Sequence, residues 1–185
     1  MDNKPRLKEK YEKGIKAEMQ KEFAIKNIMA VPTITKIVIN SGLGEGKDDG
    51  SIIEQLTEDI TMLAGQRPVV TKASKAISNF KIKVGDKIGV MVTLRGDMMW
   101  YFLDRLISIV LPRIKDFRGV PFGSFDKRGN YALGIKEHTV FPEVDSSKII
   151  KIRGLQVIIC TSSVNDQQAF ALLKKLGMPF KKKEN

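Results

Sequence analysis

Residues 87–95 read Lys-Ile-Gly-Val-Met-Val-Thr-Leu-Arg. Side chains alternate between the two faces of a β-strand. One face of this predicted strand is therefore apolar and consists of Ile88, Val90, Val92 and Leu94. The other face consists of Lys87, Gly89, Met91, Thr93 and Arg95. A strand with one apolar and one polar face is typical of an antiparallel sheet that is covered on one side only.

Residues 33–40 repeat this pattern. Ile37 and Ile39 point to one face, and the opposite face consists of Lys36, Val38 and Asn40. A polar face is often only solvated, but two strands agree here, and the chain carries a net charge of +11 with a pI of about 9.7. We therefore interpret the open face as a binding surface for a polyanion.

The helices follow from apolar spacing and end signals. A first helix has an apolar stripe that we expect to contact the core, at Leu7, Tyr11, Ile15, Met19 and Phe23. A second begins with a capping box, Ser51 with Glu54, and ends at Gly65. A third, 98–110, is capped by Asp97 and apolar on nearly all sides. A fourth is capped by Asn165 and ends at Gly177.

Further strands are predicted at 69–71, 131–136 and 154–161. Residues 80–84 and 87–95 flank Gly85-Asp86, a pair typical of a tight hairpin. The sequence thus predicts an α+β fold, with a largely antiparallel sheet, helices on one face and an open polar and basic face. We expect one domain over 1–185, ending in a flexible basic tail at Lys181–Lys183.

Composition narrows the function. Nucleic acid and an anionic membrane both suit a basic chain, but no run of about eighteen apolar residues and no export leader is present. We therefore expect a cytoplasmic protein that binds no membrane. The single cysteine, Cys160, lies in an apolar run and is predicted to be a buried structural thiol.

The segment 113–131 combines five basic residues with four aromatic residues and three glycines. Cations neutralise phosphates and rings stack on bases, so the segment suits an RNA contact. An equally open alternative is a basic loop whose rings anchor it to the core. The basic residues are Arg113, Lys115, Arg118, Lys127 and Arg128.

The polar face favours folded RNA over single strands or DNA. An RNA-recognition motif places aromatic residues on its central strands, whereas the corresponding positions here carry Lys, Asn, Thr and Arg. These groups reach phosphates and 2′-hydroxyls. No base-reading helix or pair of zinc ligands indicates DNA recognition.

The sequence motifs argue against an enzyme. The glycines in 42–46 match neither the dinucleotide fingerprint nor the P-loop, and a mobile turn explains them better. His138 is the only histidine, which excludes multi-histidine metal sites and leaves one possible catalytic base. We expect neither a cofactor nor a catalytic metal.

Several strings, in order along nearly the whole chain, resemble the bacterial large-subunit ribosomal protein five family, which binds 5S ribosomal RNA. They lie at 31–32, 36–40, 64–68, 71–73, 92–96, 112–119, 124–131, 141–143 and 177–180. Among them are Ala-Gly-Gln-Arg-Pro at 64–68 and Ser-Phe-Asp-Lys-Arg-Gly-Asn-Tyr at 124–131.

The resemblance implies a structural, non-catalytic component of the central protuberance of the large subunit. Its implied partners are 5S and 23S ribosomal RNA, the peptidyl-site transfer RNA and a small-subunit head protein, the last near 137–148. Matching positions nominate Lys36, Asn40, Gln66 and Thr93 for 5S RNA, and the strand pattern adds Arg95. The loop implied to approach transfer RNA contains Lys72, Ser74, Lys75, Ser78 and Asn79.

Two positions and one short stretch depart from the family pattern. Ser74 and Asn79 stand where a basic residue and a glycine are common, and 121–123 replaces a more basic stretch. We therefore expect one fewer electrostatic contact with transfer RNA. The alternative functions are a cytoplasmic regulator that binds RNA or DNA with little sequence preference, and a nucleotide-dependent enzyme.

Overall fold

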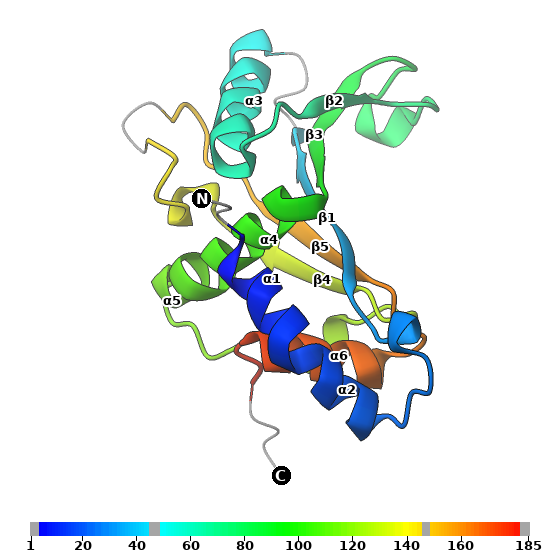
Figure 1. Ribbon diagram of the computed structural model, residues 1–185. Helices are drawn as coiled ribbons and strands as arrows, with labels where there is room; N and C mark the ends of the chain where they lie inside the picture. The colour runs from blue at the N-terminus through cyan, green and yellow to red at the C-terminus, as the bar shows by residue number, and fades with distance from the viewer. Residues whose placement is uncertain (1–3, 45–48, 146–148, 182–185) are drawn as a thin grey trace. The chain divides into compact units, whose positions relative to one another are not determined.

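The computed structural model describes residues 4–44, 49–145 and 149–181 (Figure 1). Five strands form one antiparallel sheet of order β2-β3-β1-β5-β4. The strands are β1 (Ile34–Gly42), β2 (Val69–Lys72), β3 (Lys87–Leu94), β4 (Tyr131–Ile135) and β5 (Leu155–Thr161). The predicted α+β class is confirmed.

The chain divides into two compact units. The first unit comprises 1–37, 95–133 and 158–185, and the second comprises 38–94 and 134–157. The boundary falls within β1, β4 and β5, so each of these strands contributes to both units. The expectation of a single domain stays a prediction, and each unit is described by itself.

In the first unit, residues 6–22 form one helical run, with α1 (Arg6–Lys10), a π-helical segment (Tyr11–Ile15) and α2 (Lys16–Glu22). The predicted stripe is buried as far as Met19, and Phe23 is half-buried. Apolar residues four apart drift around an α-helix, which has 3.6 residues per turn. The wider π turn offsets this drift and keeps the stripe facing the core.

A second helical run in this unit consists of α4 (Gly96–Arg105), a π-helical segment (Leu106–Val110) and α5 (Leu111–Arg113). The predicted Asp97 cap is wrong, because Arg95 is the N-cap residue and makes no side-chain cap bond. Asp97 instead accepts a hydrogen bond from Lys8 Nζ at 2.8 Å. Arg6 pairs with Asp104 in the same way, at 2.6 Å, so α1 is tied to α4 by two surface ion pairs.

The first unit also contains α6 (Asp166–Leu176), and here the predicted end signals are confirmed. Asn165 Oδ1 accepts from the Gln168 backbone N–H at 3.0 Å, and Gly177 ends the helix at φ +106°. Lys175 of α6 pairs with Glu18 and Glu22 of α2. Of the predicted basic tail, Lys182 and Lys183 lie outside the described residues.

In the second unit, α3 (Gly50–Ala64) buries Ile53, Leu56, Ile60 and Leu63 and ends at Gly65, where φ is +68°. The predicted capping box is wrong. Asp49 is the N-cap residue, and its carboxylate accepts the Ser51 backbone N–H at 2.9 Å. Asp49 comes before Ser51 in the chain, and an aspartate caps as well as a serine does.

The second unit also holds the β2–β3 pair, whose register is Val69↔Met91 and Val70↔Val90. The predicted hairpin strand at 80–84 is wrong. The turn at Gly85-Asp86 exists, with Asp86 N–H donating to the Lys83 carbonyl, but 78–80 is a 3-10 turn and Lys81 has φ +52°. The partner of β3 is therefore β2, and 73–86 forms a long tongue beyond the two strands (Figure 1).

Burial along β1 and β3 follows the predicted alternation except at Ile88, which is exposed, and Gly89, which is buried. Ile37, Ile39, Val90, Val92 and Leu94 are buried. Ile88 is 37% exposed, since β3 leaves the core towards the tongue. The prediction of a buried Cys160 is wrong. Val157 and Ile159 take the core face of β5, so Ile158 and Cys160 lie on the opposite face and are half-buried. Among the described residues, no helix is both long and apolar enough to cross a bilayer.

Candidate RNA interface

The five residues nominated for 5S RNA lie at or beside β1 and β3. Lys36 and Asn40 are half-buried on β1, on the face opposite Ile37 and Ile39. Thr93 is half-buried on β3, while Gln66 and Arg95 are exposed. In the described part of the chain, none of these five side chains bonds to another residue, so their polar groups are available to a ligand.

Three of these residues belong to the second unit, where strand pairing relates them. β1 and β3 are neighbours in the sheet and carry Asn40 and Thr93. The register Val69↔Met91 runs antiparallel, so the chain before β2, including Gln66, approaches the end of β3 that carries Thr93. Lys36 and Arg95 belong to the first unit.

The open face is less uniformly basic than the sequence analysis expected. Val69 is 67% exposed and lies beside Met91, which is 37% exposed. On β5, Gln156 is exposed and Ile158 is half-buried on the face opposite Val157. Gln156 was missed, although its place between Leu155 and Val157 indicates the open face. The surface therefore offers apolar contact as well as hydrogen bonds.

The loop implied to approach transfer RNA is the tongue at 73–86, with Lys72 at its base. Ala73 N–H donates to the Asp86 carbonyl at 2.8 Å, and Gly85 N–H donates to the Ala73 carbonyl at 2.9 Å. The predicted contact residues all lie exposed on one arm, and they are Lys72, Ser74, Lys75, Ser78 and Asn79. Phe80 is also exposed, at 71%. The sequence analysis had placed Phe80 in a strand.

In the basic-aromatic segment 113–131, most rings serve as anchors. Phe125 packs edge-on against Tyr131 at 4.8 Å between centroids, and Phe122 packs edge-on against Phe170 at the same distance. Tyr131 donates from its hydroxyl to the Pro121 carbonyl at 2.8 Å, and burial raises its pKa to about 12. These three rings therefore hold the segment to the first unit. Its exposed basic side chains are Arg113, Lys115, Arg118, Lys127 and Arg128.

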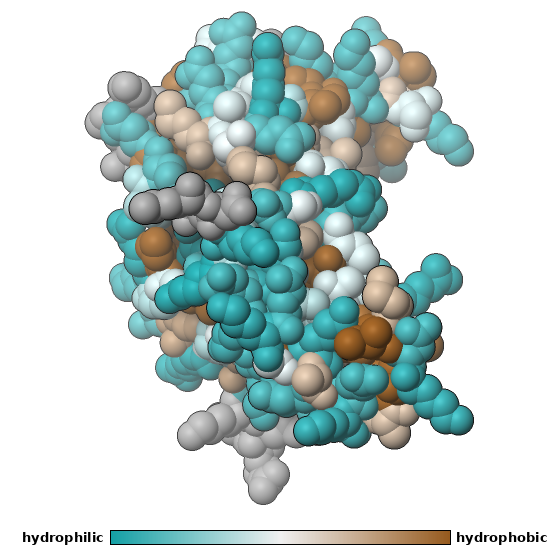
Figure 2. Space-filling model, viewed as in Figure 1, coloured by the Kyte–Doolittle hydropathy of each residue, from teal (hydrophilic) through white to brown (hydrophobic). Residues whose placement is uncertain are grey.

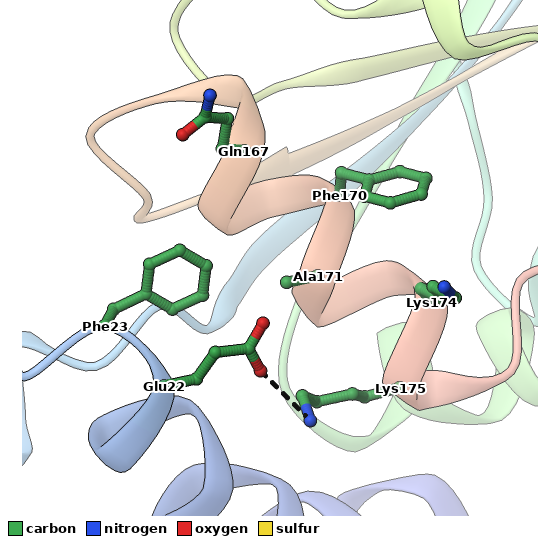
Figure 3. Close-up of a pocket in the computed structure, with 7 residues that line it drawn as sticks. All are labelled: Glu22, Phe23, Gln167, Phe170, Ala171, Lys174 and Lys175. Carbon is green, nitrogen blue, oxygen red and sulfur yellow. Dashed lines mark ion pairs between the residues drawn. The ribbon is translucent and has the colours of Figure 1, made fainter.

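A groove of about 520 Å³ lies between α2 and α6 in the first unit (Figure 3). Phe23 and Phe170 line it, and the Lys175–Glu22 ion pair, 3.2 Å long, closes one side. Lys174 Nζ lies 5.8 Å from the centre of the Phe170 ring, where it makes a cation–π contact. Glu22 and Lys175 are thus paired with each other, and Lys174 with a ring.

His138 occupies the second unit and is 1% exposed. Its Nδ1 lies 3.1 Å from both the backbone nitrogen and the carbonyl oxygen of Arg153, and its Nε2 lies 3.3 Å from Asp59 Oδ2. Burial raises the pKa of Asp59, and attraction to His138 opposes this rise. A histidine enclosed in this way holds structure together and does not reach a substrate.

Comparison with known proteins decides the family. The sequence model described as "Ribosomal protein L5" matches residues 27–83, and the one described as "ribosomal L5P family C-terminus" matches 87–180. The "Large ribosomal subunit protein uL5" of Chloroflexus aurantiacus is 55% identical over 176 residues, 95% of this chain and 98% of that one. The protein of the same name from Thermoanaerobacter sp. is 54% identical over 177 residues, 96% and 99% of the two chains. The chain belongs to the ribosomal protein L5 family.

The boundary between the two matched regions falls within the tongue. Residues 84–86, which include the Gly85-Asp86 turn, separate the N-terminal match from the C-terminal match. β1 and β2 therefore belong to the first matched region and β3 to the second. The face that carries Asn40 and Thr93 is built from both.

Ribosomal L5 proteins are structural and non-enzymatic, so the chain is not an enzyme. The enclosed His138 agrees with this assignment. Within 4–44, 49–145 and 149–181, no group of three His, Cys, Asp or Glu side chains is arranged to hold a metal ion.

Proposed function

We propose that this member of the ribosomal protein L5 family, a structural constituent of the large ribosomal subunit, binds 5S ribosomal RNA through the open face of its sheet. The observation that carries the proposal is the set of unbonded polar side chains on β1 and β3, centred on Asn40 and Thr93. Half-buried amide and hydroxyl groups suit 2′-hydroxyl and phosphate contacts along a folded RNA. The chain acts as one RNA-binding domain in the cytoplasm.

Basic side chains supply most of the affinity. Lys36 lies on β1 and is half-buried, Arg95 directly follows β3, and the segment 113–131 adds Arg113, Lys115 and Arg118, which are exposed like Arg95. Neutralising phosphates releases counterions and favours binding whatever the sequence of the RNA. These groups bind 5S RNA and neighbouring 23S ribosomal RNA, while the sheet face sets position.

The tongue contacts the peptidyl-site transfer RNA. Residues 72–87 contain five lysines and one acidic residue, Asp86. The arms are cross-linked by backbone hydrogen bonds at Ala73 and Ile77, so the tongue extends as an ordered arm. Lys72 and Lys75 are the two cations among the predicted contact residues.

A small-subunit head protein contacts the second unit near 137–148, of which 146–148 lie outside the described residues. Outside 72–87, this unit has six basic and nine acidic residues, a net charge of −3. A surface of this sign repels RNA and attracts a basic protein. Glu137 and Asp145 are exposed there.

The sheet face is tested with the double variant Lys36→Ala/Asn40→Ala in binding assays with bacterial 5S RNA. We expect affinity to fall at least tenfold, since one phosphate contact and one amide contact are lost. Lys81→Ala, which removes one charge on the tongue, is the control and is expected to change affinity less than threefold. Equal effects of the two variants would show that only total charge matters.

The tongue is tested on assembled ribosomes. Lys72→Ala/Lys75→Ala should weaken binding of transfer RNA in the peptidyl site several-fold and leave 5S RNA affinity of the free protein nearly unchanged. The opposite pattern, weaker 5S binding with normal transfer RNA binding, would move the tongue to the 5S interface.

A further inference from the structure

We infer that the turn 126–130 is a preorganised clamp for the RNA backbone, in which Asp126 and Asp166 hold Lys127 and Arg128 in position. The inference rests on the proposed RNA-binding function and adds a second contact that is separate from the sheet face. It makes an acidic residue, Asp166, necessary for binding a polyanion.

The carboxylates hold four consecutive backbone N–H groups. Asp166 accepts from Lys127 N–H at 3.2 Å and from Gly129 N–H at 2.9 Å. Asp126 Oδ1 accepts from Arg128 N–H at 2.8 Å and from Asn130 N–H at 3.0 Å. Burial alone raises the pKa of Asp126, but its hydrogen bonds with Asn130 and Arg128 lower the pKa overall.

In this arrangement the backbone N–H groups are occupied, while the cationic side chains stay accessible. Four neighbouring N–H groups are themselves a good anion site, but here the protein's own carboxylates fill it. The Lys127 and Arg128 side chains are exposed and form no ion pair with another residue of the described ranges. A phosphate therefore meets these two cations and not the backbone of the turn.

The turn is fixed at a cost in backbone energy. Lys127 has φ +66°, a conformation that residues other than glycine rarely adopt. Gly129 has φ +79°, and a Cβ there would lie 1.9 Å from Ser163 Oγ, so only glycine fits. Such strain persists where surrounding bonds over-determine it, and it is concentrated at functional sites.

A short series of hydrogen bonds connects the clamp to the start of β1, which carries part of the candidate interface. Gly129 carbonyl accepts from Thr161 Oγ1 at 2.8 Å, at the end of β5. The next residue, Ser162, exchanges hydrogen bonds with Thr33, just before β1 begins. Lys36 follows three residues later on β1. The first unit thus joins the turn to the strand whose open face is proposed to bind RNA.

Binding of bacterial 5S RNA by purified variants tests the clamp. Asp166→Asn raises the net charge by one, as does the control Glu12→Gln on the exposed surface of the first helical run. If total charge alone mattered, both would bind as tightly as the parent chain or more tightly. The clamp predicts that Asp166→Asn binds three- to tenfold more weakly, while Glu12→Gln does not lose affinity.

The variant Lys127→Ala/Arg128→Ala gives the second arm. A plot of the logarithm of the binding constant against the logarithm of the salt concentration should become less steep by about 1.5, as expected for about two lost phosphate contacts. Adding Asp166→Asn to this variant should have no further effect, because the positioned cations are gone. A merely structural Asp166 would weaken binding equally in both backgrounds.

The outcomes separate the two proposals. If the parent chain fails to prefer 5S RNA over transfer RNA, the proposed function fails. The clamp is overturned if the parent chain prefers 5S RNA but Asp166→Asn binds as tightly as Glu12→Gln. It is also overturned if Asp166→Asn weakens binding equally in the parent chain and in the Lys127→Ala/Arg128→Ala variant. Circular dichroism shows whether Asp166→Asn folds. If it does not fold, the variant Lys127→Ala/Arg128→Ala decides, because it alters only exposed side chains. Unchanged affinity of this double variant for 5S RNA would then overturn the clamp.

Discussion

The two units of this chain, of 104 and 81 residues, differ in charge by more than their lengths explain. The first unit has 21 Lys+Arg against 11 Asp+Glu, a net charge of +10, and the second has 11 against 10, a net charge of +1. Nearly all of the excess charge therefore lies in the first unit. The face of the molecule in Figure 2 is covered mainly by hydrophilic side chains.

The second unit divides its charges further. Residues 72–87 contain five lysines and one acidic residue, and the rest of the unit is net negative. A uniform basic field would serve any polyanion equally well. Under the proposed function, this uneven distribution predicts that the first unit supplies affinity for ribosomal RNA, while the second supplies position and contacts with other partners.

The largest expected effect comes from charge in the first unit. Replacing Arg113, Lys115 and Arg118 by Gln should weaken 5S RNA binding about a hundredfold near 0.15 M salt, because three phosphate contacts are lost. The matched variant in the second unit replaces Lys72, Lys75 and Lys81 by Gln and should cost less than threefold. Titrations at several salt concentrations measure both.

Equal losses in those two triple variants would break the comparison, since they would show that affinity follows total charge. A larger loss from the tongue variant would reverse the roles of the units. Circular dichroism of each variant checks that the fold is retained.

The next effect concerns stability, because the second unit contains a buried polar pair. His138→Leu leaves Asp59 and the Arg153 N–H without a partner, and we expect the free energy of unfolding to fall by about 2–3 kcal/mol. Urea denaturation measures this loss. A variant as stable as the parent chain would show that water replaces the imidazole, and that the pair contributes little.

A smaller effect is expected on the sheet face, where uncharged variants separate the contribution of hydrogen bonds to RNA affinity from the contribution of charge. Asn40→Ala/Thr93→Val should weaken 5S RNA binding about tenfold, since two hydrogen-bonding groups are lost at about 0.5–1.5 kcal/mol each. Neither change alters charge, so the salt slope and the binding of duplex DNA should stay the same. A changed slope would indicate that the RNA docks differently on the variant.

The smallest effect is expected at the surface ion pairs of the first unit. Lys175 lowers the pKa of Glu18 by its hydrogen bond, so the pair stabilises the fold above the carboxyl group's unfolded pKa. That contribution is lost as the pH falls through the lower, folded pKa. In urea denaturation, Lys175→Met should show less loss below pH 4 than at pH 7, and at both far less than His138→Leu.

The sequence predicted those elements whose signals are local. The apolar stripe from Leu7 to Met19, the Asn165 cap and the glycine ends at Gly65 and Gly177 were all correct. The errors arose where two local signals compete or a distant residue intervenes. Asp49 precedes Ser51 as cap, Lys8 binds Asp97, and β2 is the partner of β3 in place of residues 80–84.

The candidate site was predictable only in part. Alternation placed Lys36, Asn40 and Thr93 on the open face, whereas Gln66 came from the family resemblance. The sequence alone does not decide whether the rings of 113–131 stack on RNA or anchor the segment, because this depends on Phe170 and Phe180, far along the chain. It also gave no sign that Asp166 holds the turn at Lys127, 39 residues away.

The central claim is specific recognition of 5S RNA by this basic chain. Equilibrium binding of the purified protein to bacterial 5S RNA, with transfer RNA and duplex DNA as competitors over a range of salt, tests it most directly. We predict a preference for 5S RNA of about a hundredfold or more, about 2.7 kcal/mol, that persists as salt rises. Equal affinity for all three, falling together with salt, would mean that the +11 charge alone accounts for binding and would contradict the claim.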